Sequence, residues 1–285
     1  MSYIIDGKAI SAQIKEECRE RVERLREKGV SVTLAVVLVG DDPASCVYVN
    51  NKKKACEFCG IESRTYELPA DTTQQEVLNL VQTLNADESV NGILVQLPLP
   101  EHIDENEIIY AISPEKDVDG FHPYNVGALS IGLPGHVSCT PAGVIELLKR
   151  SNIEISGKHC VVVGRSNIVG KPMSMLLLRE NGTVTVAHSK TADLKAVTSQ
   201  ADILVVAVGK PKFITEEYVK EGAVVIDVGI HRMDNKKLCG DVDFDRVEPK
   251  TKAITPVPGG VGVMTIAMLM HNCVTAAERK ECYER

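Results

Sequence analysis

The chain has 285 residues, which is enough for one large domain or two of ordinary size. It carries 32 basic and 39 acidic residues, a net charge of −7, whereas nucleic-acid and anionic-membrane binders need a basic surface. Aromatic residues make up only 4%, with no Trp, which disfavours stacking sites for single-stranded nucleic acid. The composition predicts an α/β protein that acts on small molecules, with no nucleic acid and no membrane as partner.

The nine cysteines predict free thiols, because they do not fall into the paired spacings of a zinc site. Cys56-x-x-Cys59 is the only close pair, and without a second pair or a thioredoxin-like context we expect no metal or redox site there. Many free thiols fit a reducing compartment. No signal-peptide pattern opens the sequence, and the apolar run 261–270 is about half a membrane span. We therefore expect a cytoplasmic protein.

Helical and strand patterns alternate in the first half of the chain. Apolar residues at three- and four-residue steps predict an amphipathic helix over 6–28. The continuous aliphatic run 33–39 predicts a buried parallel strand. The elements expected next are a helix at 43–58, a strand at 63–68, a helix at 72–84 capped by Thr73, a strand at 90–97 and a helix at 105–112.

Residues 113–140 break this alternation with Gly, Pro, Asp and His, after which Thr140 and Pro141 predict the start of a helix that ends near Ser151. A second alternating unit follows, so we expect two α/β domains with the last helix packing back on the first. Its expected strands are 159–163, 183–187, 203–208 and 224–228, and its expected helices are 173–180, 193–200, 216–220 and one long helix at the end.

A glycine turn between a hydrophobic strand and a helix predicts a dinucleotide site. The spacing is Gly164-x-Ser166-x-x-x-Gly170, one residue longer than the common G-x-G-x-x-G pattern and with Ser in the middle position. Gly164 can form the tight turn, and main-chain N–H groups at the helix start, with the Ser166 hydroxyl, can bind phosphate oxygens.

The end of the next strand favours NADP over NAD. An NAD site usually has an acidic residue there, which binds the ribose 2′-hydroxyl. This chain instead has His188, Ser189 and Lys190, with Arg165 in the glycine turn. These residues would accept a 2′-phosphate, with no carboxylate to repel it. The alternative is that 188–190 is only a solvated loop.

The first domain offers a Tyr–Lys pair, an amide and two carboxylates. Tyr48 and Lys52 are four residues apart on one predicted helix, so they share a face. Gln96 stands at the carboxyl end of a buried strand, where open α/β sheets bind ligands. Asp117 and Asp119 lie in the irregular segment between the domains, and such loops often carry function.

Five segments together resemble the FolD family of bifunctional methylenetetrahydrofolate dehydrogenase/methenyltetrahydrofolate cyclohydrolases. They are YVNNK, GILVQLPLP, PEKDVDGFHPYNVG, GRSNIVGKP and PGGVG, in this order. The sequence departs from the family pattern at Ser138 and Val263, where the family usually has proline. Both departures put the local shape in question, and neither touches the chemistry.

The resemblance implies a folate-binding catalytic domain, residues 1–138 with helix 263–285, and a Rossmann-type NADP-binding domain, residues 139–262, with the active-site cleft between them. It implies that hydride leaves 5,10-methylenetetrahydrofolate for NADP and that water converts the methenyl cation into 10-formyltetrahydrofolate. This one-carbon interconversion supplies purine, histidine and methionine biosynthesis. A homodimer is expected from the resemblance alone.

The resemblance also implies the site residues. Lys52 would orient and deprotonate water if burial and the folate cation disfavour its ammonium form, with Gln96 holding the lysine or the water. Tyr48 would pack on the pterin, and Asp119 would accept hydrogen bonds from it. The expected catalytic residues are Lys52, Tyr48, Gln96 and Asp119. The cofactor-binding set is Gly164, Arg165, Ser166, Ser189 and Ile230. The substrate-binding set adds Val95, Leu97, Pro258, Gly259, Gly260, Val261 and Gly262 to the four catalytic residues, and no metal is expected.

Two alternatives remain open: a dehydrogenase without cyclohydrolase activity, and a non-catalytic NADPH-binding regulator. Lys52 and Gln96 speak against the first, and the presence of all four catalytic candidates speaks against the second. His122 and His231 each lack an acidic partner at a readable spacing, so we expect both to be structural.

Overall fold

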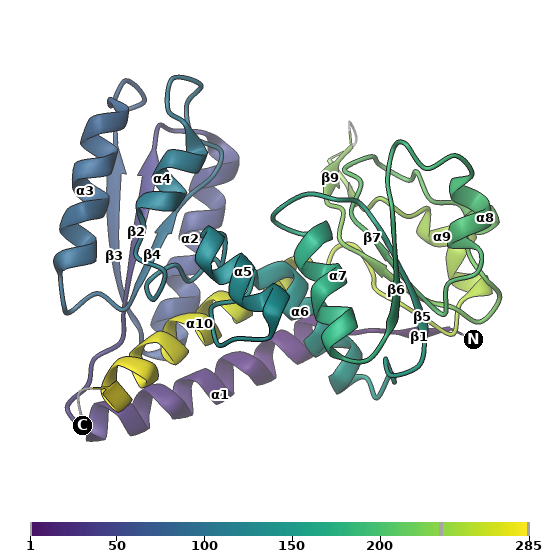
Figure 1. The fold of residues 1–285 in the computed structure, drawn as a ribbon, viewed down its shortest axis with the longest axis horizontal. Coiled ribbons are helices and arrows are strands. Elements are labelled where there is room, and N and C mark those ends of the chain that lie inside the picture. The colour runs from purple at the N-terminus through teal and green to yellow at the C-terminus, as the bar shows by residue number, and fades with distance from the viewer. Residues whose placement is uncertain (1, 234–235, 284–285) are drawn as a thin grey trace. The chain divides into compact units, whose positions relative to one another are not determined.

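The computed structural model describes residues 2–233 and 236–283, which form two units (Figure 1). We call them the three-stranded unit, residues Ala12–Val137 with 266–283, and the six-stranded unit, residues 2–11 with Ser138–Thr265. The resemblance implied a first domain of residues 1–138. By contacts, residues 2–11 group with the six-stranded unit, because strand β1 (Tyr3–Ile4) pairs in parallel with β11 (Ala253–Ile254).

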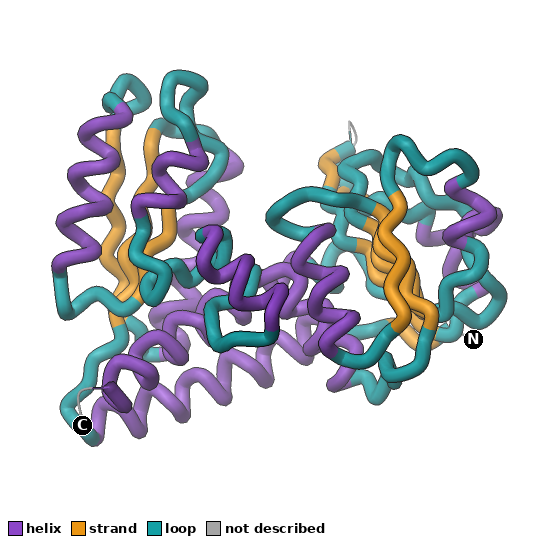
Figure 2. The backbone as a smooth tube through the Cα atoms, viewed as in Figure 1, coloured by secondary structure: helices purple, strands orange, loops and turns teal. Residues whose placement is uncertain are grey.

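In the three-stranded unit, a parallel sheet has the order β3-β2-β4. Figure 2 shows the strands in orange with helices around them. The strands are β2 (Thr33–Val39), β3 (Glu62–Leu68) and β4 (Gly92–Val95). The helices are α1 (Gly7–Glu27), α2 (Pro43–Cys59), α3 (Gln74–Ala86), α4 (Glu105–Ala111), α5 (Pro123–Ile131) and α10 (Gly262–Tyr283), of which α1 and α10 also contribute residues to the other unit.

Every residue of β2 is buried, as expected for a central parallel strand covered on both faces. One face packs on α3 and α4 through Val37, Val81 and Ile108, among others. On the other side, Cys273 of α10 approaches the Thr33 carbonyl, and Cys56 of α2 contacts Met270. Helix α3 begins at the predicted cap, where Thr73 and Glu76 form a reciprocal capping box.

The six-stranded unit has a parallel sheet in the order β1-β11-β8-β7-β5-β6. Because β6 lies on one side of β5 and β7 on the other, the chain reverses direction across the sheet at β5, which is where such folds bind ligands. The remaining strands are β5 (His159–Val163), β6 (Thr183–Ala187), β7 (Ile203–Val206), β8 (Val224–Asp227) and the antiparallel pair β9 (His231–Arg232) and β10 (Leu238–Cys239). The helices are α6 (Cys139–Arg150), α7 (Gly170–Arg179), α8 (Leu194–Thr198), α9 (Phe244–Val247) and the 3₁₀ turns η1 (Glu216–Tyr218) and η2 (Glu248–Lys250).

Two local predictions are wrong in the region between the alternating segments. Helix α5 forms inside 113–140, with the His122 side chain capping its first turn and Gly132 closing it in a left-handed conformation. Helix α6 begins at Cys139 and its N-cap position is Ser138, so Thr140 lies inside the helix. The Thr140 hydroxyl instead pairs with that of Thr265, at 2.8 Å.

Candidate active site

Lys52 and Gln96 come from different elements and meet through a direct hydrogen bond. Lys52 lies in α2 and is only 9% exposed. Its Nζ donates to Oε1 of Gln96 over 2.8 Å. The Gln96 Nε2 in turn donates to the Leu97 carbonyl over 2.6 Å, so the amide oxygen is the atom that faces the lysine. The bond fixes the position of a buried amine at the carboxyl end of β4.

The segment that carries Asp119 runs beside β4 in the manner of a short extra strand. Ile93 and Asp117 form a parallel bridge, and the Ile93 N–H donates to the Lys116 carbonyl over 2.8 Å. Gly92 permits this approach, because a Cβ there would lie 2.7 Å from Val118 Cγ1. The pairing ends there, because the main chain turns at 118 and 119. Asp119 lies close enough to Lys52 for the two charges to interact, which places it near the Lys52–Gln96 pair.

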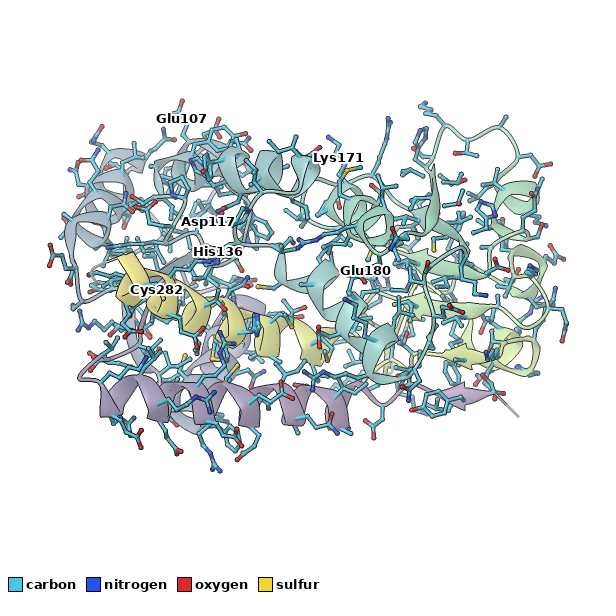
Figure 3. All side chains as sticks on the ribbon, turned by 60° about the horizontal axis from the view of Figure 1, so that its bottom comes forward. Glu107, Asp117, His136, Lys171, Glu180 and Cys282 are labelled. Carbon is cyan, nitrogen blue, oxygen red and sulfur yellow. The ribbon has the colours of Figure 1, made fainter. Side chains whose placement is uncertain are left out.

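The Asp117 carboxylate forms all of its hydrogen bonds with groups of the protein itself. It is buried, and its carboxylate accepts from the N–H groups of Gly120 (3.2 Å) and His122 (2.8 Å) and from Nδ2 of Asn125 (2.9 Å). Asn125 also accepts from the main-chain N–H of His136 at 3.1 Å, and Figure 3 labels both Asp117 and His136. These bonds shape the turn that presents Asp119.

Asp119 has a different environment. No residue in the described part of the chain donates a hydrogen bond to its partly buried side chain. Burial raises the pKa of this carboxyl to about 6; the Lys52 ammonium acts in the lowering direction and the Asp117 carboxylate in the raising direction. A carboxylate without internal donors is available to the N–H groups of a ligand.

The other candidates in this unit surround the same strand end. Tyr48 lies one helical turn before Lys52 and is 44% exposed, so its ring is free to contact a ligand. Val95 is the last, buried residue of β4, and Leu97 is half-buried beyond Gln96. The structure therefore brings together Lys52, Gln96 and Asp119, and places Tyr48 on the helix face above Lys52.

In the six-stranded unit, the turn after β5 has no room for a side chain at either of its glycines, Gly164 and Gly170. Gly164 has φ +131°, and a Cβ there would lie 2.3 Å from the Ala207 carbonyl oxygen. A Cβ at Gly170 would lie 2.3 Å from the Gly164 carbonyl oxygen. The Ser166 Oγ accepts from the N–H groups of Val169 (3.2 Å) and Gly170 (3.3 Å), which leaves its hydroxyl hydrogen for a ligand.

A cavity of about 220 Å³ opens beside this turn, at the carboxyl ends of β5, β6 and β7. Arg165 and Ser189 line it together with His188 and Lys210, so these side chains are placed where they could bind a 2′-phosphate together. Among the described residues that line it there is no Asp or Glu. Lys190 is not a lining residue; its main-chain N–H donates to His188 Nδ1. The full lining is Val163, Gly164, Arg165, His188, Ser189, Leu194, Ala207, Val208, Lys210 and Phe213.

The glycine-rich segment 258–262 belongs to the six-stranded unit, not to the unit that holds Lys52. Pro258 is exposed, whereas Gly259, Gly260 and Val261 are buried. A Cβ at Gly262 would lie 2.5 Å from Cδ1 of Ile230, so this segment and the cofactor candidate Ile230 are in close contact. The substrate-binding set expected from the sequence is therefore divided between the two units.

Two buried aspartates, Asp227 and Asp241, were not among the residues predicted from the sequence. His231 does have an acidic partner, because its Nε2 lies 2.7 Å from Oδ1 of the fully buried Asp241. Asp227 is also buried and accepts from the main chain of 241 and 242. The position of Asp227 at the end of β8 was a usable signal, but the contacts of Asp241 with Asp227 and His231 depend on the β9–β10 hairpin. His122 is structural as expected, since its Nδ1 accepts from the Tyr124 N–H.

One of the two departures from the family pattern fits its surroundings. Ser138 is buried, and its hydroxyl donates to the Ile168 carbonyl over 2.6 Å, a bond that proline cannot make. The Val263 main-chain carbonyl accepts from the Ser11 hydroxyl over 3.1 Å, a bond that proline would make equally, so nothing in the structure explains the valine. Ser138 thus ties the start of α6 to the turn that precedes α7.

Comparison with known proteins shows that two successive parts of the chain match models of the same protein family. Residues 5–119 match the model of the tetrahydrofolate dehydrogenase/cyclohydrolase catalytic domain, and residues 138–281 match that of the NAD(P)-binding domain of the same family. The chain belongs to the tetrahydrofolate dehydrogenase/cyclohydrolase family. The resemblance inferred from the sequence motifs is therefore confirmed, as is the α/β fold with its NAD(P)-binding domain.

Relatives within this family are similar over nearly the whole chain. The bifunctional protein FolD of Lachnoclostridium phytofermentans is 67% identical over 279 residues, which cover 98% of this chain and 99% of that protein. The FolD crystal structure from Campylobacter jejuni has a TM-score of 0.97 at 53% identity and covers 98% and 100% of the two chains. A FolD structure from Trypanosoma brucei, in complex with NADP and an inhibitor, has a TM-score of 0.93 at 42% identity, over 98% of each chain.

All nine cysteines lie among the described residues, and each is a free thiol. Cys56 and Cys59 are buried in α2, and burial raises the pKa of each thiol to about 12. Within 2–233 and 236–283, no cluster of three His, Cys, Asp or Glu side chains could hold a metal ion. Over the same residues, no helix combines the length and the hydropathy that a membrane span requires.

Proposed function

We propose that the side chains gathered at the end of β4 carry out the folate chemistry of this chain. The chain oxidises 5,10-methylenetetrahydrofolate with NADP and hydrolyses the resulting methenyl compound to 10-formyltetrahydrofolate, as its family membership and its bifunctional relatives indicate. The observation that carries the assignment of residues is the hydrogen bond between the buried Lys52 and Gln96, 2.8 Å long.

Asp119 binds the pterin. Its carboxylate is partly buried, receives no hydrogen bond from the described residues, and lies close enough to Lys52 for the two charges to interact. Two parallel N–H donors, such as the amine and ring N–H of a pterin, match a carboxylate in bidentate geometry. Tyr48 packs on the pterin ring, and the ends of β4 at Val95 and Leu97 complete this part of the site.

Lys52 acts in the hydrolysis. Water adds to the methenyl carbon and loses one proton to the Lys52 amine, which gives a hydroxy adduct. The hydroxyl of the adduct then becomes the formyl carbonyl as the bond from that carbon to one folate nitrogen breaks, and the hydroxyl proton passes to that nitrogen. Gln96 holds the amine so that a lone pair or N–H of Lys52 points at the water.

The hydride step needs positioning more than acid–base help, because a folate nitrogen lone pair stabilises the cation that forms. When bound, NADP supplies the hydride acceptor. Gly164 and Ser166 bind its phosphates through the glycine turn, and Arg165 and Ser189 bind the 2′-phosphate in the cavity that both line. Ile230 and the segment 258–262 contact each other and complete the binding surface of this unit.

We also propose the assignment of the three-stranded unit to folate and of the six-stranded unit to NADP, together with a cytoplasmic homodimer. Nine free thiols suit a reducing compartment. The dimer rests on the resemblance, and light scattering should give about twice 31.0 kDa. The 10-formyl product is a one-carbon donor, consistent with supply of purine, histidine and methionine biosynthesis.

The deciding experiment compares Lys52→Met with the matched control Lys53→Met. Lys53 follows directly in the same helix but is exposed. We expect Lys52→Met to lower hydrolysis of methenyltetrahydrofolate by at least ~100-fold, as loss of a general base does, while hydride transfer to NADP remains measurable. Lys53→Met should behave like the wild type in both assays. Hydrolysis by Lys52→Met at the wild-type rate would exclude the proposed role of this lysine.

A further inference from the structure

The loop that follows β7 forms one wall of the cofactor cavity, and its conformation depends on a residue outside that cavity. Ala207, Val208 and Lys210 line the cavity. The main-chain N–H groups of Val208, Gly209 and Lys210 do not bond to a neighbouring strand. All three donate to the carboxylate of Asp241, at 2.7, 3.0 and 2.8 Å.

The Asp241 carboxylate is completely buried, and its donors are divided evenly between its oxygens. Oδ2 accepts from Val208 and Gly209, and Oδ1 accepts from Lys210 and from Nε2 of His231, at 2.7 Å. Only an ionised carboxylate offers two oxygens with two acceptor sites each. An amide of the same size would have one acceptor oxygen for four donors.

A second carboxylate holds Asp241 in place. Asp227, at the end of β8, accepts from the N–H groups of Asp241 (2.9 Å), Val242 (2.9 Å) and Gly229 (3.0 Å). The surrounding space is full. A Cβ at Gly229 would lie 2.4 Å from Cγ of Asp241, and a Cβ at Gly240 would lie 1.8 Å from Oδ2 of Asp227. The Asp241 carboxylate therefore has no other position from which it could accept the three hydrogen bonds of the loop.

We propose that Asp241 is a positioning residue for NADP binding, which fixes the 207–210 wall of the cofactor cavity through its three main-chain hydrogen bonds. His231 assists by occupying the fourth acceptor site and by placing a donor next to the buried charge. The inference rests on the proposed binding of NADP in this cavity. Within the described residues, the Asp241 carboxylate has no hydrogen bond to a side chain that lines the cavity, so it acts through the main chain of the loop.

The test is NADPH binding by Asp241→Asn, followed through the fluorescence of NADPH on titration with protein. With a single acceptor oxygen, at least two of the four donors lose their partner, and we expect the Kd for NADPH to rise at least ~10-fold. In the dehydrogenase assay, the KM for NADP should rise by a similar factor, while kcat at saturating NADP stays within about twofold of the wild type.

Asp202→Asn is the matched control. Asp202 lies in the same unit, and its carboxylate also accepts a main-chain N–H, that of His159 at 2.9 Å, but it lies at the amino ends of the strands and lines no part of the cofactor cavity. We expect this substitution to lower the melting temperature without changing the Kd for NADPH. An unchanged Kd in Asp241→Asn, or an equal rise in Asp202→Asn, would overturn the proposal.

His231→Leu keeps the inference testable if Asp241→Asn does not fold. It removes one donor to Asp241 and leaves the carboxylate, so we expect a smaller rise in the Kd, about threefold. A folded His231→Leu protein with the wild-type Kd would then overturn the proposal. Failure of the wild type itself to bind NADPH would instead contradict the proposed function, so the two failures are distinguishable.

Discussion

The end of β4 and the turn after β5 are both proposed ligand sites at the carboxyl end of a parallel strand, but they differ in the kind of atom that would bind the ligand. At β4 the proposed functional atoms belong to the side chains of Lys52, Gln96 and Asp119, which come from three separate segments. At β5 the glycine turn supplies main-chain atoms in a space too small for a Cβ. Changes of side chain at the first site should therefore lower the reaction rate, whereas changes in the backbone conformation at the second site should weaken the binding of NADPH.

The largest expected effect comes from Gly164→Ala. The new Cβ would lie 2.3 Å from the Ala207 carbonyl oxygen, and the residue has φ +131°. Clash and backbone strain together should raise the Kd for NADPH by at least ~100-fold and lower the melting temperature. Gly157→Ala is the control, since its φ is +72° but nothing lies within 4 Å of a Cβ. Similar NADPH affinities in the two variants would show that the close approach is not needed.

Arg165→Ala tests whether side chains also matter in the second site. We expect the KM for NADP to rise by roughly 10- to 100-fold, because a charged hydrogen bond to the 2′-phosphate is lost. The KM for NAD should change by less than about twofold, since NAD has no phosphate at that position. Lys190→Ala, whose side chain lines no part of the cavity, is the matched control. Equal losses for both cofactors would contradict a 2′-phosphate contact.

The pH dependence of folate binding tests the first site. Burial raises the pKa of Asp119 to about 6, so below this pH the carboxyl becomes protonated and loses its capacity to accept two N–H groups. The KM for methenyltetrahydrofolate should rise by up to ~10-fold per pH unit below about 6. In Asp119→Asn the KM should be high at every pH and nearly flat. A flat wild-type profile between pH 5 and 7 would contradict the role of Asp119.

Protein stability should change with pH in the opposite sense. Because the folded pKa of Asp119 lies above its ordinary value of 3.8, the stabilisation is complete below pH 3.8 and is lost as the pH rises through about 6. Asp227 contributes in the same direction, since burial raises its pKa to about 6 as well. Denaturant titrations should therefore show a weaker decline in stability between pH 4 and 6 for Asp119→Asn than for the wild type.

The smallest expected effect is that of Ser138→Ala. It removes the hydrogen bond to the Ile168 carbonyl, 2.6 Å long, and should cost about 1 kcal/mol of folding free energy. Thermal unfolding followed by circular dichroism measures this as a fall of a few degrees. Ser151→Ala, whose hydroxyl has no hydrogen-bond partner among the described residues, should change the melting temperature less. The reverse order would show that the bond contributes nothing.

The sequence predicted elements whose pattern is local. The bounds of β2 and β5 agree with the aliphatic runs, because a buried parallel strand must be apolar on both faces. The bounds of β6 also agree with the prediction, although it is an edge strand and most of its residues are not buried. Strand β1 was missed because two residues carry no periodicity, and their conformation depends on β11, about 250 positions away. Helix α5 was missed because Pro123 and Gly127 suggested a loop, whereas the proline occupies the first helical turn.

The candidate site shows the same limit. The family motifs singled out Lys52, Gln96 and Asp119, and the structure adds the contacts that join them. Nothing local distinguished Asp117 from Asp119, although one is saturated by the protein and the other receives no internal bond in the described part of the chain. Likewise the pairing of His231 with Asp241 depends on a hairpin that the sequence pattern did not predict.

The place of β1 has a consequence for the order in which the chain can fold during synthesis. The six-stranded unit uses residues near the start of the chain and residues up to Thr265, while Ala12–Val137 lie between them in the sequence. The ribosome must therefore deliver the whole intervening unit before β1 can meet β11. A fragment that begins at Ser138 would leave the edge of β11 unpaired, and exposed strand edges of this kind promote aggregation.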